Sequence, residues 1–176
     1  MTRPIARLST AMWRRSDEER DLAAMSNTLT VRPVTEADAA RVAEIFLASR
    51  RTAMPWLARP HADDETRAWF SDILVPRGTV VVAEVDTGVV GFADPRDGWL
   101  HALYVVPSAQ GAGVGSALFE HSMTLAPGGF DLWVFQRNIR ALDFYARYGC
   151  VEVRRTEGAD NEEHEPDVLL HWSPTR

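Results

Sequence analysis

The chain contains no lysine, only one cysteine and no long apolar run. All 19 cationic residues are arginine, and 25 acidic residues bring the net charge to −6. We therefore expect no nucleic acid partner, because such partners require a basic surface. The lone Cys150 excludes an intrachain disulfide and is typical of a reducing compartment. No segment reaches the roughly 18 consecutive apolar residues of a membrane span, so we expect a cytoplasmic protein without a membrane partner.

Apolar residues are nevertheless abundant enough for one domain. They make up 45% of the 176 positions, a proportion that suits a single hydrophobic core. Residues 1–27 are charged, lack apolar periodicity and contain no signal-peptide core. We expect a mobile N-terminal extension over these residues and a single domain over residues 28–176.

The hydrophobic pattern predicts strands and helices in the order β-α-α-β-β-β-α-β-α-β-β. Thr35 and Asp38 form a capping-box start for the first helix. This order has no internal repeat and is typical of an α/β protein with a mixed central sheet. The expected strands cover residues 29–34, 79–85, 89–93, 99–106, 132–135, 151–155 and 168–172. The first three expected helices cover residues 35–51, 63–74 and 114–125.

The most informative stretch, residues 103–116, contains a strand, a proline turn, a glycine-rich loop and a helix start. Pro107 ends the strand, and three glycines in five residues lead into the helix that begins at Val114. Glycines let the backbone approach a ligand closely, and a helix start offers unpaired N–H groups and a positive dipole end. We predict that this loop holds a phosphate or pyrophosphate. It has neither Gly-Lys-Ser/Thr nor G-x-G-x-x-G, which excludes a P-loop and a dinucleotide fingerprint.

This stretch resembles the Gln/Arg-x-x-Gly-x-Gly/Ala signature of the GCN5-related N-acetyltransferase (GNAT) superfamily, with Gln110, Gly113 and Gly115 at the signature positions. The resemblance implies that backbone N–H groups of the loop bind the pyrophosphate of acetyl-CoA. It also implies that backbone groups of Leu103 and Val105 pair with the pantetheine arm as an added strand would. The implied cofactor-binding residues here are Leu103, Val105, Gln110, Gly111, Ala112, Gly113, Val114, Gly115 and Ser116.

A second segment is similar to the family's later strand–helix unit, Asn-x-x-Ala-x-x-Phe-Tyr-x-x-x-Gly-Phe. Here Asn138 can cap the helix and Gly149 suits its end, while Cys150 replaces the usual phenylalanine. Asn138 and Tyr145 share one helix face because they lie seven positions apart. The resemblance implies that Asn138 helps to hold the cofactor and that Tyr145, a phenol of pKa ~10, protonates the leaving thiolate. The alternatives are a simple helix cap and a packed aromatic residue.

The resemblance covers residues 29–172 and implies the GNAT fold, acetyl-CoA as co-substrate and no metal. Acetyl transfer to an amine also requires a base. His101 is one candidate, because strand alternation places it on the same sheet face as Leu103 and because histidine titrates near neutrality. Glu84 in an adjacent strand is the other. A lone strand histidine is often structural, and Trp99 stands where several relatives carry glutamate, so the choice stays open.

The acceptor site is expected from two segments. The resemblance implies that the segment containing Trp56, Trp69 and Phe70 lines the acceptor site, although core packing explains these residues equally well. An acidic loop before the last strand would attract a cationic amine, but it also fits a solvated surface. Its acidic residues are Glu157, Asp160, Glu162, Glu163, Glu165 and Asp167.

The resemblance thus implies an acetyl-CoA-dependent N-acetyltransferase that acts on a primary amine by direct attack in a ternary complex, with a small cationic amine favoured. One alternative is an acetyltransferase that acts on a protein N-terminus or a peptide. The other is an acyl-CoA-binding module without turnover. A homodimer is neither indicated nor excluded by the sequence.

Overall fold

The computed structural model describes residues 28–174, so the expected N-terminal extension lies outside the described residues. The elements follow the predicted order β-α-α-β-β-β-α-β-α-β-β. The strands are β1 (Thr30–Pro33), β2 (Val81–Val85), β3 (Gly88–Arg96), β4 (Trp99–Val105), β5 (Phe130–Phe135), β6 (Val151–Thr156) and β7 (Asp167–Trp172). The helices are α2 (Ala39–Ala53), α3 (Asp63–Trp69), α4 (Val114–Leu125) and α5 (Ile139–Arg147).

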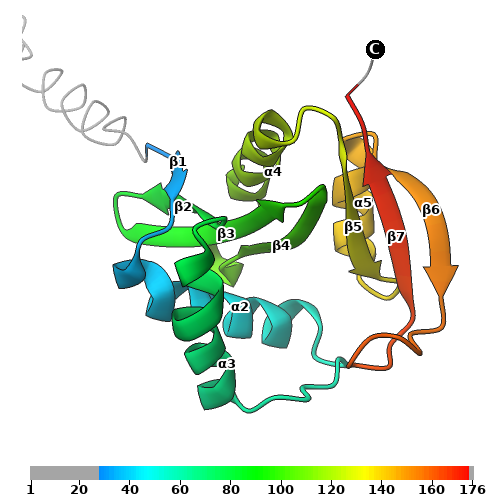
Figure 1. Ribbon diagram of the computed structural model, residues 1–176, viewed down its shortest axis with the longest axis horizontal. Coiled ribbons are helices and arrows are strands. Elements are labelled where there is room, and N and C mark those ends of the chain that lie inside the picture. Colours follow the sequence, from blue (N-terminus) through cyan, green and yellow to red (C-terminus); the bar gives the residue numbers. More distant parts are fainter. Residues whose placement is uncertain (1–27, 175–176) are drawn as a thin grey trace, which may run out of the picture.

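The strands form one mixed sheet in the order β1-β2-β3-β4-β5-β7-β6. The predicted mixed α/β architecture is therefore confirmed. Neighbouring strands are antiparallel except β4 and β5, which are parallel and pair only through Trp99 and Asp131 before they separate. Figure 1 shows the resulting gap between a half containing β1 to β4 and a half containing β5, β7 and β6. This opening places an unpaired strand edge in the middle of the molecule.

Two hydrophobic cores cover the two faces of the sheet. Val81 and Val82 are neighbours in β2 but belong to different cores, since successive side chains of a strand point to opposite faces. One core contains residues of α4 and α5, and the other contains residues of α2 and the segment after α3. Figure 1 accordingly shows α2 and α3 on one side of the sheet and α4 on the other.

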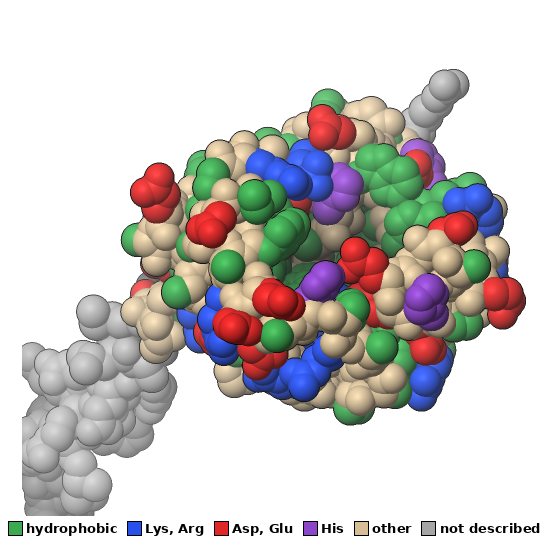
Figure 2. All heavy atoms as spheres, turned by 60° about the horizontal axis from the view of Figure 1, so that its bottom comes forward, with side chains coloured by type: hydrophobic (Ala, Val, Ile, Leu, Met, Phe, Trp, Pro, Cys, Tyr) green, Lys and Arg blue, Asp and Glu red, His purple; other side chains and the backbone are tan. Residues whose placement is uncertain are grey.

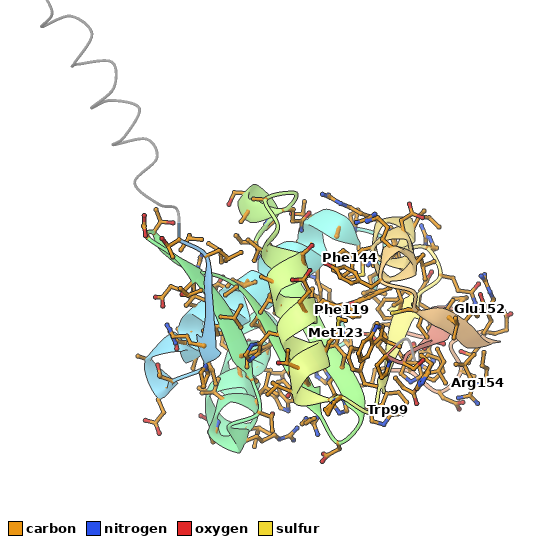
Figure 3. All side chains as sticks on the ribbon, turned by 90° about the horizontal axis from the view of Figure 1, so that it is seen from above. Trp99, Phe119, Met123, Phe144, Glu152 and Arg154 are labelled. Carbon is orange, nitrogen blue, oxygen red and sulfur yellow. The ribbon has the colours of Figure 1, made fainter. Side chains whose placement is uncertain are left out.

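An aromatic cluster joins the two halves on the α4 side. The ring of Phe119 in α4 lies 5.8 Å from Phe144, 5.6 Å from Tyr145 and 5.4 Å from Phe130, measured between centroids. Figure 3 shows Phe119 and Phe144 pointing toward one another from α4 and α5. Phe119 is fully buried, so this contact fixes α5 relative to α4.

Some helix and strand boundaries differ from the predicted ones. The helix expected over residues 63–74 is α3 followed by a π-helical turn, Phe70–Leu74, and a short 3₁₀ turn, Val75–Arg77. Gly78, with φ of +71°, then ends the helical segment. The strand expected to end at Ala93 continues to Arg96 because it pairs with β4. No helix among residues 28–174 is long and apolar enough to cross a bilayer.

Candidate active site

A cavity of about 500 Å³ lies between the end of β4, the glycine loop, the start of α4 and α5. All the residues expected to bind the cofactor line this cavity, except Ala112 and Val114. Ala112 is exposed at the loop tip. The Val114 side chain is buried against β3, where a Cβ on Gly91 would meet it at 3.0 Å. Val114 therefore contributes only its backbone to the loop side of the cavity.

The glycine loop has the geometry of an anion site. Gly111 and Gly113 both adopt φ of +83°, a left-handed conformation that favours glycine, and a Cβ at either position would meet no atom within 4 Å. The first bond of α4 runs from the N–H of Ala117 to the carbonyl of Gly113 at 3.0 Å. The three N–H groups before Ala117 thus lack a partner within the helix and are available to an anion.

The free edge of β4 borders the same cavity. The N–H of Val106 donates to the carbonyl of Val90 in β3, whereas the carbonyl of Val105 accepts from Ser49 Oγ at 2.7 Å and from Gln110 Nε2 at 3.1 Å. The Val105 carbonyl therefore faces away from β3. By strand alternation the backbone of Leu103 faces the same way, as the expected added-strand pairing requires.

His101 lies where β4 is irregular. Leu103 pairs with Ala93 and Leu100 with Pro95, so His101 and Ala102 together oppose one residue of β3. This bulge interrupts the alternation on which the placement of His101 beside Leu103 was based. The His101 side chain is exposed near Trp99 and lines neither this cavity nor the second one described below. Although the side chain reaches solvent, neighbouring residues partly desolvate the imidazole, and this desolvation together with the nearby Arg96 lowers its pKa, so the imidazole is neutral at neutral pH.

Glu84 lies away from both cavities. It is in β2, two strands from the free edge of β4. Its carboxylate accepts a hydrogen bond from Arg32 at 2.7 Å, and Arg32 also binds Asp38 at 2.8 Å. Arg32 lowers the pKa of both carboxyl groups. The structure therefore engages Glu84 in an ion-pair network and does not bring it to the expected thioester.

The two ends of α5 are fixed by its caps. The Oδ1 atom of Asn138 accepts from the N–H of Ala141 at 3.3 Å, so the residue caps the helix and also lines the cavity. At the other end Gly149 adopts φ of +77°, and its N–H donates to the Ala146 carbonyl. The N–H of Cys150 donates to the Tyr145 carbonyl at 3.1 Å, which completes a Schellman motif. These bonds hold the backbone of Tyr145 in place.

Tyr145 is packed but faces the cavity. Its side chain is 8% exposed, lies 5.6 Å from Phe119 between ring centroids, and lines the cavity wall. Among residues 28–174 no fully buried side-chain oxygen or nitrogen lacks a partner. We find no hydrogen bond from the Tyr145 hydroxyl within that range, so this hydroxyl must reach the cavity. Burial raises its pKa, which keeps it protonated at neutral pH.

A second cavity, of about 440 Å³, lies between α2, α3 and two loops, residues 54–62 and residues 157–166. Trp69 and Phe70 line it as expected, whereas Trp56 packs edge-on against Phe135 and under the guanidinium of Arg137. Of the acidic loop residues only Glu162 and Glu163 line it. Figure 2 shows a hollow on this side of the molecule, with hydrophobic side chains inside and acidic side chains near its rim.

The two loops contact each other and the end of α2. Glu163 binds Arg50 of α2 at 2.6 Å, and Glu162 binds His61 at 2.9 Å. Arg50 lines the second cavity, and its neighbour Ser49 donates to the Val105 carbonyl on β4. The two cavities therefore approach the free edge of β4 from opposite faces of the sheet.

Several residues of these cavities were not predicted. Arg140 and Arg147 of α5 line the first cavity, together with Asp143 and Phe144. Arg140 and Arg147 are seven positions apart, the same spacing as Asn138 and Tyr145, and this spacing was a usable signal. No comparable spacing in the sequence marks the second-cavity residues Phe46, Arg50 and His61. Among residues 28–174 no group of His, Cys, Asp and Glu side chains is arranged to hold a metal ion.

Comparison with known proteins identifies one family. Residues 40–150, more than half of the chain, match the model of the acetyltransferase (GNAT) family. The chain is 36% identical over 97 residues to the peptidyl-lysine N-acetyltransferase YjaB of Salmonella typhimurium, a match that covers 54% of this chain and 66% of that protein. It is 33% identical over 93 residues to an uncharacterized N-acetyltransferase of Archaeoglobus fulgidus, with 44% and 61% covered. The chain thus spans less than two thirds of the length of these curated relatives.

Solved structures share the fold. The apo-form of YjaB from Escherichia coli superposes with a TM-score of 0.67 at 24% identity and covers 84% of this chain and 99% of that one. YncA from Salmonella typhimurium, solved with its cofactor acetyl-CoA, gives a TM-score of 0.62 at 17% identity and covers 85% and 95%. At these identities the likeness is one of fold.

Proposed function

The chain belongs to the acetyltransferase (GNAT) family, and on that premise we propose that it transfers the acetyl group of acetyl-CoA to a primary amine by direct attack in a ternary complex. The main support is the arrangement of the two cavities on either side of the free edge of β4. A thioester that reaches this edge from the α5 side is accessible through the gap to an amine held on the α2 side. Direct attack needs no enzyme nucleophile, and burial raises the pKa of the Cys150 thiol to about 11, which disfavours its thiolate.

Acetyl-CoA occupies the first cavity in this proposal. The pyrophosphate lies against the glycine loop and the start of α4, and the pantetheine arm pairs with the backbone of Leu103 and Val105. Backbone N–H groups on this edge stabilise the oxyanion that forms during attack. Tyr145 donates its hydroxyl proton, or a hydrogen bond, to the departing thiolate.

Arg140 and Arg147 supply positive charge to the phosphates. Replacing both by glutamine is expected to weaken acetyl-CoA binding by roughly tenfold, because each lost phosphate contact removes a charge-assisted interaction. The loss should shrink as salt rises, since exposed charges are screened. Isothermal titration calorimetry at two salt concentrations measures both effects. Arg154→Gln on β6 serves as the control, because Arg154 packs over the ring of Trp133 and does not line the first cavity. An affinity equal to that of the wild type would show that the phosphates lie elsewhere.

His101 is the proposed base, acting through water because its side chain lies outside both cavities. The base must be a neutral imidazole, so kcat/KM should rise with pH as His101 loses its proton. Because the pKa of His101 lies below the ordinary value of histidine, kcat/KM should reach its plateau by neutral pH. His101→Ala should remove this rise of kcat/KM with pH. His121 belongs to α4 and lines neither cavity, so His121→Ala should retain the rise. The measurement is a pH–rate profile of CoA release. Identical profiles for the wild type and His101→Ala would assign the base elsewhere.

The acceptor is a small amine bound in the second cavity. Acidic side chains favour a cationic amine there. The contacts between the two loops close the cavity on the side of residues 157–166. A peptide acceptor is the second candidate, favoured by the name of the Salmonella relative, a peptidyl-lysine N-acetyltransferase. A screen of small amines and lysine-containing peptides, read by CoA release, separates the two. An acetyl-CoA-binding protein that releases no CoA with any acceptor would indicate a binding module instead.

A further inference from the structure

We propose that the acceptor is a primary amine attached to an aromatic group and without a carboxylate, with its ring against Trp69 in the second cavity. This inference rests on the proposed acetyl transfer and names the substrate class of the same site. Two independent features of the cavity carry it, an aromatic wall and an unbalanced set of charges.

The aromatic wall contains Phe46, Trp69 and Phe70. Phe70 is buried, and its ring is tilted against that of Phe46 at 5.2 Å and edge-on to that of Trp69 at 5.4 Å, measured between centroids. Trp69 is different because 44% of its surface is exposed although it lines the cavity. Covering such a large aromatic surface with a ligand ring is favourable. A cavity of about 440 Å³ is within the size range of small-molecule sites.

The positive charges that line this cavity already have partners. Arg50 binds Glu163 at 2.6 Å, and Arg59 lies 3.3 Å from Asp63. Each arginine that lines the cavity therefore already has a carboxylate partner, which weakens its attraction for a ligand carboxylate.

The negative charges are in excess. Glu65, Glu162 and Glu163 all line the cavity. Glu163 uses Oε1 for Arg50, and its Oε2 has no hydrogen-bond partner among residues 28–174 and is not fully buried. An ammonium group is attracted to this oxygen and to the other two carboxylates, whereas a carboxylate on the acceptor is repelled. The cavity thus favours an amine over the corresponding amino acid.

The test uses three probes, 2-phenylethylamine, n-butylamine and L-phenylalanine. The full chain with acetyl-CoA should give kcat/KM values for CoA release that are roughly tenfold or more higher for 2-phenylethylamine than for n-butylamine, because the ring buries additional apolar surface. The preference over L-phenylalanine should be of similar size, because the carboxylate is repelled. Calorimetry with the CoA-bound protein measures the binding of each probe independently of turnover.

Two substitutions test the wall. Trp69→Ala should lower kcat/KM for 2-phenylethylamine roughly tenfold more than for n-butylamine, and Trp69→Leu, which retains apolar bulk, should have a smaller effect. Trp133→Ala is the matched control, since Trp133 is 40% exposed and does not line this cavity. Acetyl-CoA affinity shows that each variant is folded.

The charges are tested separately. Glu65→Gln combined with Glu162→Gln should reduce the preference for 2-phenylethylamine over L-phenylalanine several-fold. Glu36→Gln combined with Glu157→Gln removes two exposed charges outside the cavity and should leave that preference unchanged.

Equal kcat/KM and equal affinity for 2-phenylethylamine and n-butylamine would overturn the inference, as would equal use of L-phenylalanine. Identical effects of Trp69→Ala and Trp133→Ala would also overturn it. If calorimetry shows tight, Trp69-dependent binding of 2-phenylethylamine but no amine releases CoA, the inferred ligand class stands and the proposed acetyl transfer fails.

Discussion

Replacing Tyr145 by phenylalanine is expected to lower kcat by roughly 10²–10⁴-fold, the usual contribution of a general acid, while the affinity for acetyl-CoA changes little. Phenylalanine keeps the ring contacts with Phe119 and Phe144 and removes only the hydroxyl. That hydroxyl has no protein partner among residues 28–174, so its removal leaves no buried group unsatisfied. The fold should therefore tolerate the change, and the loss should fall on the step in which the thiolate departs.

Tyr148→Phe provides the control on the same helix turn. The Tyr148 ring also packs on Phe119, at 4.6 Å between centroids, but its hydroxyl donates to Glu120 and the residue does not line the cofactor cavity. The rate of CoA release at saturating substrates is compared for the two variants, with acetyl-CoA affinity from calorimetry. If Tyr145→Phe and Tyr148→Phe both retain the wild-type rate, Tyr145 is a packing residue only.

The order of elements could be predicted because its signals are local. Helix α4 begins at Val114 and ends at Leu125 as predicted, since glycines precede it and apolar residues recur at helical spacing within it. The capping box at Thr35 and Asp38 and the cap at Asn138 are likewise formed by residues close in sequence. Such features depend little on the rest of the chain.

The bulge in β4 could not be predicted, because it is a property of a strand pair. It arises where two residues of β4 oppose Asp94 of β3, and a register shift of this kind leaves no mark in either strand alone. Its consequence is functional, since it decides where His101 points relative to Leu103. Alternation along one strand was therefore an insufficient basis for placing His101.

The cofactor side of the site was more predictable than the acceptor side. The glycine loop is contiguous, and its function depends on backbone geometry that glycine spacing reveals. The second cavity combines residues 46–70 with a loop late in the chain, and the pair of Arg50 and Glu163 is separated by 113 positions. Nothing in the sequence distinguishes Trp56 from Trp69 as acceptor-site residues. In the structure Trp56 packs against Arg137 and Phe135, whereas Trp69 lines the cavity. Packing between residues far apart in the sequence therefore determines which tryptophan lines the cavity.

Gly113→Asp is expected to weaken acetyl-CoA binding by roughly 10²–10³-fold. A carboxylate at the start of α4 would stand close to the proposed pyrophosphate, and two like charges about 4 Å apart repel by about 4 kcal/mol at an effective dielectric constant near 20. The protein has room for the side chain, because a Cβ at Gly113 meets no atom within 4 Å. The remaining cost is the φ of +83°, which aspartate adopts reluctantly.

A second glycine separates this strain from the charge effect. Gly98, in the turn between β3 and β4, has φ of +75° and open space around its Cβ, and it lines neither cavity. Gly98→Asp should therefore lower the melting temperature about as much as Gly113→Asp but leave acetyl-CoA affinity intact, while Gly113→Asn should fall between them in affinity. Calorimetry and thermal unfolding of the three variants give both quantities. A folded Gly113→Asp protein that binds acetyl-CoA as tightly as Gly98→Asp would mean that the glycine loop does not hold the pyrophosphate, and the cofactor site would have to be sought outside the first cavity.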